Sequence, residues 1–132
     1  MNNKSMRILI ADDHELIRNG IRNLLAGLSK YEVCGEAVNG QEAVRLAKEL
    51  RPDVIIMDMV MPLMNGLEAT KHVIKDGCDA RILIFTLHEA KSLAETARKA
   101  GARGFLPKSQ VCHSLISALE QLHDGGTFFD GA

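Results

Sequence analysis

Carboxylate, hydroxyl and ammonium side chains directly follow four short apolar runs of the sequence. In chain order, these residues are Asp12, Asp13, Asp58, Thr86 and Lys108. If the runs are parallel strands of one sheet, their carboxyl ends meet at one edge, which is where open α/β sheets bind ligands. Three carboxylates at one edge suit a hard divalent cation such as Mg²⁺, and a carboxylate can also attack phosphorus. The set therefore predicts metal-assisted phosphoryl chemistry.

Each of these residues also has an ordinary structural explanation. Asp12, with Glu15 three residues later, has the pattern of a helix capping box. Asp58 could simply end a strand, and Thr86 could be a strand residue because threonine has a high β-propensity. Lys108 could be a solvated surface lysine. All four explanations would have to hold together at one sheet edge, so we favour a shared site.

Five short apolar runs are expected to form the strands that position this chemistry. Three of them are continuous and rich in Ile and Val, which is typical of strands buried on both faces of a parallel sheet. Gly35 and Glu36 interrupt the second run. The expected strands are residues 8–11, 33–38, 54–57, 82–85 and 105–107.

Apolar residues at helical spacing occur between and after these runs. The last stripe closes near Gly125 and Gly126, where a helix C-cap is expected. Strand and helix thus alternate five times, which predicts an α/β fold of the (βα)5 type, a doubly wound parallel five-stranded sheet with helices on both faces. The expected helical stripes lie within residues 17–28, 43–50, 67–74, 90–97 and 111–122.

Composition predicts one globular domain. The chain has 132 residues, of which 46% are hydrophobic and 25% are charged. No linker or composition break divides it, so we expect a single domain over residues 1–132 with flexible ends at residues 1–6 and 127–132. The 16 Lys and Arg residues nearly balance the 17 Asp and Glu residues. This balance argues against a primary nucleic-acid or membrane-surface binder, because both need a basic face.

The cysteines and the apolar runs bear on the expected cellular location. Cys34, Cys78 and Cys112 are scattered, which suits reduced thiols and fits neither a disulfide framework nor a zinc site. No segment approaches the ~18 consecutive apolar residues of a membrane span. We therefore expect a cytoplasmic protein with no membrane partner.

Four segments of the sequence resemble the receiver domain of two-component response regulators. They are ILIADDHELIR (8–18), DVIIMDMVMPLMNG (53–66), ILIFT (82–86) and AGARGFLPK (100–108). The resemblance covers nearly the whole chain, and the run from Asp58 to Gly66 is its most specific part. It implies a flavodoxin-like or CheY-like fold with strand order 2-1-3-4-5.

The resemblance also implies a role for each site residue. Asp58 would be phosphorylated by a sensor histidine kinase, and Thr86 and Lys108 would contact the phosphoryl group. Phe105 occupies the aromatic switch position of the family, and without a hydroxyl it must act through burial of its ring. Mg²⁺ would be bound by Asp12, Asp13, Asp58 and the backbone carbonyl of Val60.

Two departures from the commonest receiver pattern indicate a branch of the family. Ser109 follows Lys108 where many receivers have proline, and Pro107 precedes it. This order, with the ending Gly125–Phe129, resembles the NarL/FixJ branch, whose members carry a C-terminal LuxR-type helix-turn-helix. We expect DNA binding only through such a domain, which is absent from these 132 residues, and the isomer of the Leu106–Pro107 bond is left open.

The same family implies a signalling domain rather than an enzyme, one that catalyses only its own phosphorylation and autodephosphorylation. The helix expected near residues 90–100 presents mostly alanine, so moving it should be inexpensive. We expect this helix, the strand at 105–107 and the helix at 111–122 to form the output surface. A homodimer is expected through that surface or through the first and fifth helices.

The remaining histidines are expected to be structural. None, His14 included, is predicted to pair with a cysteine or a carboxylate at ligand spacing. Val60 and His88 lie two residues beyond Asp58 and Thr86, and apolar Val60 cannot orient a hydrolytic water, which predicts a moderately long-lived phosphate.

Three alternatives compete with a phosphorylated receiver. A haloacid-dehalogenase-like hydrolase needs a second Asp where Val60 stands, and a nucleotide- or flavin-binding domain needs a Gly-rich phosphate loop that the sequence lacks. A non-phosphorylated interaction module of the same fold remains open.

Overall fold

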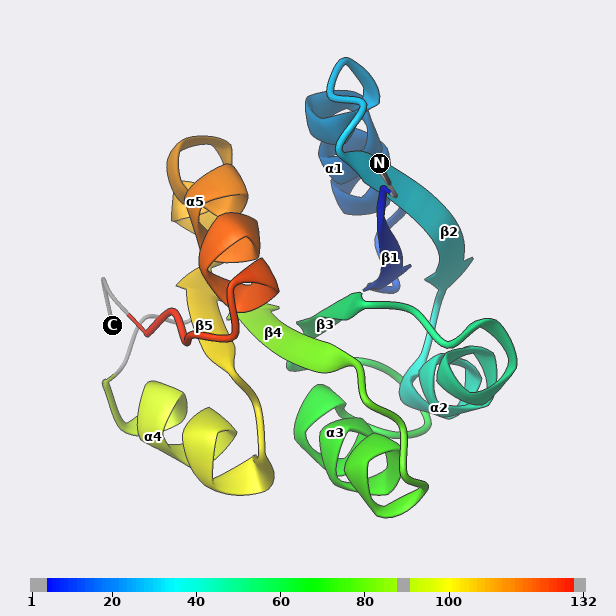
Figure 1. Ribbon diagram of the computed structural model, residues 1–132. Helices are drawn as coiled ribbons and strands as arrows, with labels where there is room; N and C mark the ends of the chain where they lie inside the picture. The colour runs from blue at the N-terminus through cyan, green and yellow to red at the C-terminus, as the bar shows by residue number, and fades with distance from the viewer. Residues whose placement is uncertain (1–4, 88–90, 130–132) are drawn as a thin grey trace.

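Five short strands form one parallel sheet in the computed structural model, which describes residues 5–87 and 91–129 (Figure 1). The strand order is β2-β1-β3-β4-β5. Every neighbouring pair is parallel, with Asp58 opposite Phe85 and Thr86 opposite Pro107 in the register. The strands are β1 (Met6–Ala11), β2 (Tyr31–Ala37), β3 (Val54–Asp58), β4 (Arg81–Thr86) and β5 (Gly104–Pro107).

A helix follows each strand, and the helices cover both faces of the sheet. α1 and α5 lie on one face, while α2, α3 and α4 lie on the other (Figure 1). A short 3-10 helix, η1 (Lys108–Gln110), leads into the last helix. The helices are α1 (Glu15–Ala26), α2 (Gly40–Leu50), α3 (Gly66–Lys75), α4 (Lys91–Ala100) and α5 (Val111–His123).

Local sequence signals explain where the helices begin and end. The side chains of Asn39 and Asn65 accept hydrogen bonds from backbone N–H groups in the first turns of α2 and α3, as N-cap residues do. Gly125, just beyond α5, has a φ of +87°, a conformation that glycine adopts without the penalty of a Cβ atom. α5 thus ends close to the expected place: Asp124 is its C-cap, and Gly125 is the residue after the cap.

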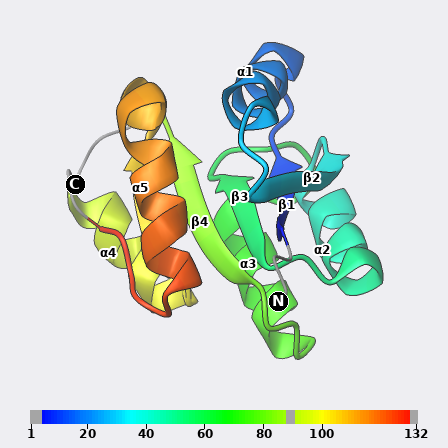
Figure 2. The same cartoon turned by 45° about the horizontal axis from the view of Figure 1, so that its top comes forward.

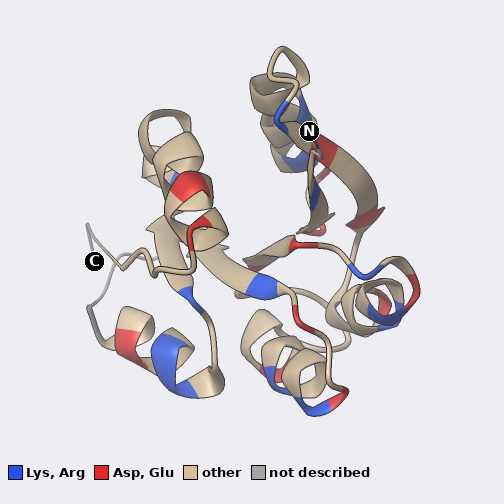
Figure 3. Ribbon diagram, viewed as in Figure 1, with Lys and Arg blue, Asp and Glu red and all other residues tan. Residues whose placement is uncertain are grey.

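The core consists of two apolar layers separated by the sheet. The layer on the α2, α3 and α4 side contains Phe105, and the layer on the α1 and α5 side contains Leu106. The residues of β3 are all buried, as expected for a central strand with helices on both faces. Figure 3 shows both signs of charge spread over the helices and strand ends, in keeping with the net charge of −1. No helix among the described residues is long and apolar enough to cross a membrane.

The segment after α5 returns to the free edge of β5. The N–H of Phe128 donates to the carbonyl oxygen of Arg103 at 2.9 Å, and the N–H of Phe105 donates to the carbonyl oxygen of Phe128 at 2.8 Å. Figure 2 shows this last described segment running back beside α5. Phe128 is 8% exposed and packs in the α5-side layer, so the edge of β5 is covered.

The (βα)5 fold and its strand order are confirmed, and the ends are more ordered than expected. Met6 begins β1 and Phe128 is buried, although residues 1–6 and 127–132 were expected to be flexible. Both residues have apolar side chains that the neighbouring layers bury. Residues 1–4 and 130–132 lie outside the described residues. α1 ends at Ala26, before Leu28.

Candidate functional site

An open pocket of about 450 Å³ lies at the carboxyl edge of the sheet. Three strands reach it: Asp58 is the last residue of β3, Thr86 the last residue of β4, and Lys108 follows β5 directly. The topology thus brings together side chains that are far apart in the sequence, as expected. The pocket is lined by Asp13, His14, Asp58, Val60, Met61, Pro62, Thr86, Leu87 and Lys108.

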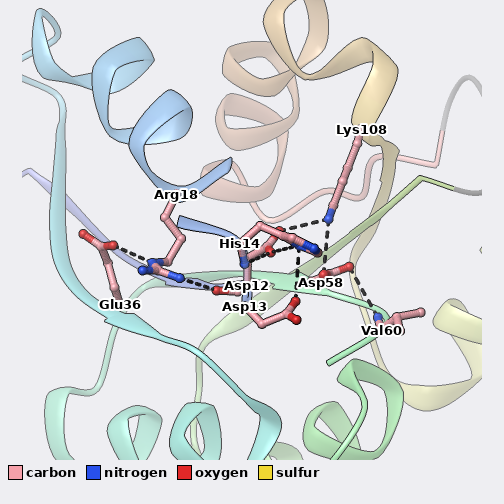
Figure 4. A network of polar contacts seen from close by, with 8 residues as sticks. All are labelled: Asp12, Asp13, His14, Arg18, Glu36, Asp58, Val60 and Lys108. Carbon is pink, nitrogen blue, oxygen red and sulfur yellow. Dashed lines mark hydrogen bonds and ion pairs between the residues drawn. The ribbon is translucent and has the colours of Figure 1, made fainter. Parts of the chain in front are cut away.

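Lys108 holds the two buried carboxylates of the pocket. Its Nζ lies 2.9 Å from Oδ2 of Asp12 and 3.2 Å from Oδ2 of Asp58 (Figure 4). The side chains of Asp12, Asp58 and Lys108 are 0%, 4% and 6% exposed. The ammonium also lies 4.8 Å from the centre of the Phe85 ring. Lys108 is therefore a buried site residue and not a solvated surface lysine.

The surroundings of Asp58 make its carboxyl harder to ionise than an ordinary aspartic acid. Burial raises the pKa of the Asp58 carboxyl above its ordinary value, and the nearby Asp12 carboxylate raises it further. Lys108 and the backbone N–H of Val60, which lies 3.3 Å from Oδ1 of Asp58, both lower the same pKa. Burial and Asp12 outweigh the two lowering contacts, so the net direction of the Asp58 pKa shift is upward and added positive charge would oppose it.

The acidic residues can bring several oxygen ligands to one point. One ligand atom each from Asp12, Asp13, His14 and Asp58 lie within 4.8 Å of one another. With the three carboxylates ionised, Lys108 leaves two formal negative charges, which is the charge a divalent cation neutralises. Carboxylate oxygens are the ligands that Mg²⁺ prefers, so the residues present fit that ion.

The structure corrects the expectation for His14. Its Nδ1 lies 3.0 Å from Oδ1 of Asp12 and 3.3 Å from Oδ1 of Asp13, so it pairs with two carboxylates of the pocket. The turn after β1 folds the His14 ring back over its two preceding neighbours, a contact that linear spacing does not reveal. The capping box of Asp12 and Glu15 is also absent: His14 is the N-cap of α1, and Asp12 Oδ1 accepts the His14 N–H.

Arg18 and Glu36 extend the network beyond the pocket, and sequence reasoning missed both. Arg18 Nη1 donates to the carbonyl oxygen of Asp12 at 2.8 Å, and its Nε donates to Oε1 of Glu36, also at 2.8 Å (Figure 4). Arg22 Nη1 lies 3.0 Å from Oε2 of the same glutamate. The available signal was an arginine near the start of an expected helix, which is too common to single out.

Thr86 and Phe105, the expected switch residues, are both buried. Thr86 is 1% exposed at the pocket, and Phe105 is 0% exposed. Phe105 does not line the pocket: it belongs to the same apolar layer as Ala94 and Ala97 of α4. No peptide bond among the described residues is cis, so the Leu106–Pro107 bond is trans. His88 lies outside the described residues.

The loop after Asp58 is held by close backbone packing. The Gly66 N–H donates to the carbonyl oxygen of Met59 at 2.8 Å. A Cβ atom on Gly66 would collide with the carbonyl oxygen of Asp58, so only glycine allows α3 to start this close to β3. Leu63, at the tip of the loop, has a φ of 68°.

Comparisons with known proteins agree with this geometry. Residues 8–120 match the response regulator receiver domain family. The chain is 36% identical over 128 residues to the transcriptional regulatory protein DegU of Brevibacillus brevis, which covers 97% of this chain and 54% of that protein. It is 37% identical over 120 residues to the response regulator UvrY of Escherichia coli K12, which covers 91% of this chain and 55% of that protein. The chain thus spans about half the length of these curated relatives.

Solved structures show the same fold. A LuxR-family two-component response regulator from Aurantimonas superimposes with a TM-score of 0.90 at 38% identity, over 96% of this chain and 90% of that one. The signal receiver domain of the putative regulator NarL from Mycobacterium tuberculosis gives a TM-score of 0.88 at 30% identity, over 92% of this chain and 98% of that one. This chain belongs to the response regulator receiver domain family, in the branch expected from its sequence.

Proposed function

We propose that this chain is the phosphoacceptor domain of a two-component system and that Asp58 receives the phosphoryl group from a sensor histidine kinase. The observation that carries the proposal is the contact between Lys108 Nζ and Asp58 Oδ2 at 3.2 Å. A buried carboxylate that faces an open pocket and touches one ammonium is accessible to a phosphoryl donor. The same ammonium is placed to neutralise charge on the group that is transferred.

Asp12, Asp13, Asp58 and the backbone carbonyl of Val60 would hold Mg²⁺. When bound, the ion would neutralise charge on the transferring phosphoryl oxygens and on the carboxylates themselves. The two formal negative charges of the pocket support this assignment. Asp12, at 0% exposed, would otherwise rely on Lys108 for most of its charge compensation.

The proposed transfer uses groups that the pocket already positions. An oxygen of ionised Asp58 attacks phosphorus, a P–O bond forms, and the P–N bond to the donor imidazole breaks. The released imidazole takes a proton from water, and the product is an aspartyl phosphate. Lys108 pairs with the phosphoryl oxygens, and the hydroxyl of Thr86 donates a hydrogen bond to one of them.

The resulting signal would pass through Thr86 and Phe105 to the output face, which we define as α4, β5 and α5. Thr86 is opposite Pro107 in the β4–β5 register, so a shift of the Thr86 side chain would be felt by the neighbouring residues of β5. Ala94 and Ala97 pack against the sheet beside Phe105, and alanines bury little area, so displacement of α4 is inexpensive. Phosphorylation needs only to bias an existing equilibrium.

A longer regulator would use the output face to control a transcriptional domain. DegU is described as a transcriptional regulatory protein, and this chain matches about half of it. We propose that DNA is contacted only through such a further domain. A homodimer would form through the output face or through α1 and α5, and the domain would catalyse only its own phosphorylation and dephosphorylation.

Intact-mass spectrometry after incubation with acetyl phosphate and Mg²⁺ tests the acceptor. We expect the wild-type protein to gain one phosphoryl group and Asp58→Asn to gain none. Asp53→Asn is the matched control, because Asp53 precedes the same strand at its opposite end and should leave the mass gain intact. Absence of any gain in the wild-type protein would contradict the proposal and favour a non-phosphorylated interaction module.

A further inference from the structure

Arg18 links the end of β1 to the end of β2 through two short hydrogen bonds. Its Nη1 donates to the carbonyl oxygen of Asp12 at 2.8 Å, and its Nε pairs with Oε1 of Glu36 at 2.8 Å. The Arg18 side chain is only 14% exposed. Figure 4 shows it lying between the Asp12 turn and Glu36, away from the mouth of the pocket.

We propose that Arg18 is a positioning residue, which fixes the Asp12 turn so that Asp12 and Asp13 are pre-arranged to bind the divalent cation. The inference rests on the proposed function, because it concerns the metal ligands of that same site. Arg18 does not itself touch the cation or the phosphoryl group. It acts on Asp12 through the main chain.

The local backbone explains why the turn needs this support. The Asp12 N–H is bonded to the carbonyl oxygen of Ala37 at 3.0 Å, so the residue is fixed from β2 on its amino side. On its carbonyl side the chain leaves the sheet and enters α1. His14, the N-cap of α1, makes no side-chain capping hydrogen bond. The bond from Arg18 to the Asp12 carbonyl therefore ties the start of α1 to the end of β1.

Glu36 keeps the guanidinium of Arg18 away from the carboxylates of the nearby pocket. An unpaired guanidinium there would be drawn to the carboxylates and would compete with the cation for them. The pairing of Arg18 Nε with Glu36 directs the charge to a different carboxylate and leaves one N–H group for the Asp12 carbonyl. Arg22 contacts the other oxygen of Glu36 at 3.0 Å, but its side chain is 47% exposed, so solvent screens this second pair and Arg18 remains the main partner of the glutamate.

Outer partners that orient metal ligands typically change metal affinity about 10- to 100-fold when they are removed. We therefore expect Arg18→Gln to weaken Mg²⁺ binding about tenfold. Arg18→Lys retains a positively charged donor group but not the fork that reaches two partners, so it should recover part of the affinity. Arg22→Gln is the matched control: it removes a charge from the same glutamate without touching Asp12, and its affinity should stay within about twofold of wild type.

Binding of Mg²⁺ alone is measured by following backbone amide signals in NMR titrations of the full chain. The second measurement is the rate of phosphorylation by acetyl phosphate as the Mg²⁺ concentration is varied. A positioning role predicts that Arg18→Gln raises the half-saturating Mg²⁺ concentration about tenfold and leaves the rate at saturation near the wild-type value. A general loss of structure would lower the rate at saturation as well.

The outcomes separate this inference from the proposed function. Wild-type affinity for Mg²⁺ in Arg18→Gln, or an equal weakening in Arg22→Gln, overturns the positioning role while the wild-type protein is still phosphorylated. A wild-type protein that neither binds Mg²⁺ nor gains a phosphoryl group overturns the proposed function itself. If Arg18→Gln does not fold, the folded Arg18→Lys variant decides: unchanged Mg²⁺ affinity in it counts against the proposal.

Discussion

The backbone N–H of Phe105 donates a hydrogen bond to the carbonyl oxygen of Phe128 at 2.8 Å. The strand that carries the proposed switch residue is therefore bonded to the segment that follows α5. The two phenylalanines of that segment pack on opposite faces of the sheet: Phe128 joins the layer with α5, and Phe129 packs against the layer with α4. Arg98 of α4 lies 4.1 Å from the centre of the Phe129 ring. A displacement of β5 or α4 would therefore also displace the segment that contains Phe128 and Phe129.

Replacing Phe128 should destabilise the domain strongly. Phe128→Ala removes a ring that is 8% exposed and leaves a cavity beside β5, so the free energy of unfolding should fall by about 3 kcal/mol. Phe129→Ala is the comparison, because its ring is only partly buried and its loss should cost less. Urea denaturation measures both values. Equal, small losses would show that the segment contributes little to the fold.

The phosphate mimic BeF₃⁻ with Mg²⁺ should perturb the output face and the segment that carries Phe128. Displacement of Thr86 and Phe105 alters β5, and the hydrogen bond from Phe105 transmits the change to Phe128. Backbone NMR signals of both phenylalanines should therefore shift in the wild-type protein. Asp58→Asn should show no such shift. Changes confined to the loops around the pocket would contradict a switch through β5.

Asp58→Asn should stabilise the metal-free protein at neutral pH. Burial and Asp12 raise the pKa of the Asp58 carboxyl above its ordinary value of 3.8, so ionising it costs more in the folded state than in the unfolded state. The contribution of Asp58 to stability is thus fully present below pH 3.8 and is lost as the pH rises through the raised pKa. The Asn variant should therefore become more stable than the wild-type protein as the pH rises through the raised pKa of Asp58.

Thermal or urea unfolding of both proteins across this pH range is the measurement. Mg²⁺ provides an internal check, because a ligand that binds only the folded state stabilises it by about 1.4 kcal/mol at ten times its dissociation constant. This gain should be clear in the wild-type protein and smaller in Asp58→Asn. An Asn variant less stable than wild type at neutral pH would show that the contact with Lys108 outweighs burial.

Gly66 should tolerate no side chain, whereas Gly20 should. A Cβ atom on Gly66 meets the carbonyl oxygen of Asp58, so Gly66→Ala should lose about 2 kcal/mol of folding stability and shift the backbone of the proposed phosphoacceptor. Gly20 lies in α1 with nothing within 4 Å of an added Cβ, so Gly20→Ala should gain up to about 1 kcal/mol. Urea denaturation and the rate of phosphorylation test the pair. Loss of stability in both variants would argue against the backbone collision.

The fold could be predicted from the sequence because its signals are local and repeated. Runs such as Val54–Met57 are apolar on both faces, which is typical of a covered parallel sheet, and the polar residue after each run indicates one sheet edge. The buried face of each helix was harder to predict from the sequence. Ile74 has the spacing of a buried residue but is 44% exposed, because α3 buries Ala69, Thr70 and Val73 instead.

The parts of the pocket that the sequence did not reveal depend on tertiary geometry. The contact of His14 with Asp12 and Asp13 follows from the tight turn after β1, and the Arg18–Glu36 pair joins residues on two elements. Neither relation has a characteristic spacing. The packing of Phe128 on β5 was missed for a related reason. Gly125 and Gly126 before it suggest a flexible segment, and no sequence pattern shows that the segment returns to the sheet.

Val60→Asn should shorten the lifetime of the phosphorylated state. Val60 is 61% exposed at the mouth of the pocket, two residues beyond Asp58, and its apolar side chain cannot orient a water for attack on phosphorus. An amide there supplies one hydrogen bond to that water, which corresponds to roughly a two- to tenfold faster dephosphorylation.

Leu63→Asn is the control, because Leu63 is 73% exposed on the same loop but does not line the pocket. The decay of phosphorylated protein, followed by intact mass after removal of acetyl phosphate, gives the rate. An unchanged rate in Val60→Asn would show that water reaches the phosphoryl group without help from this position.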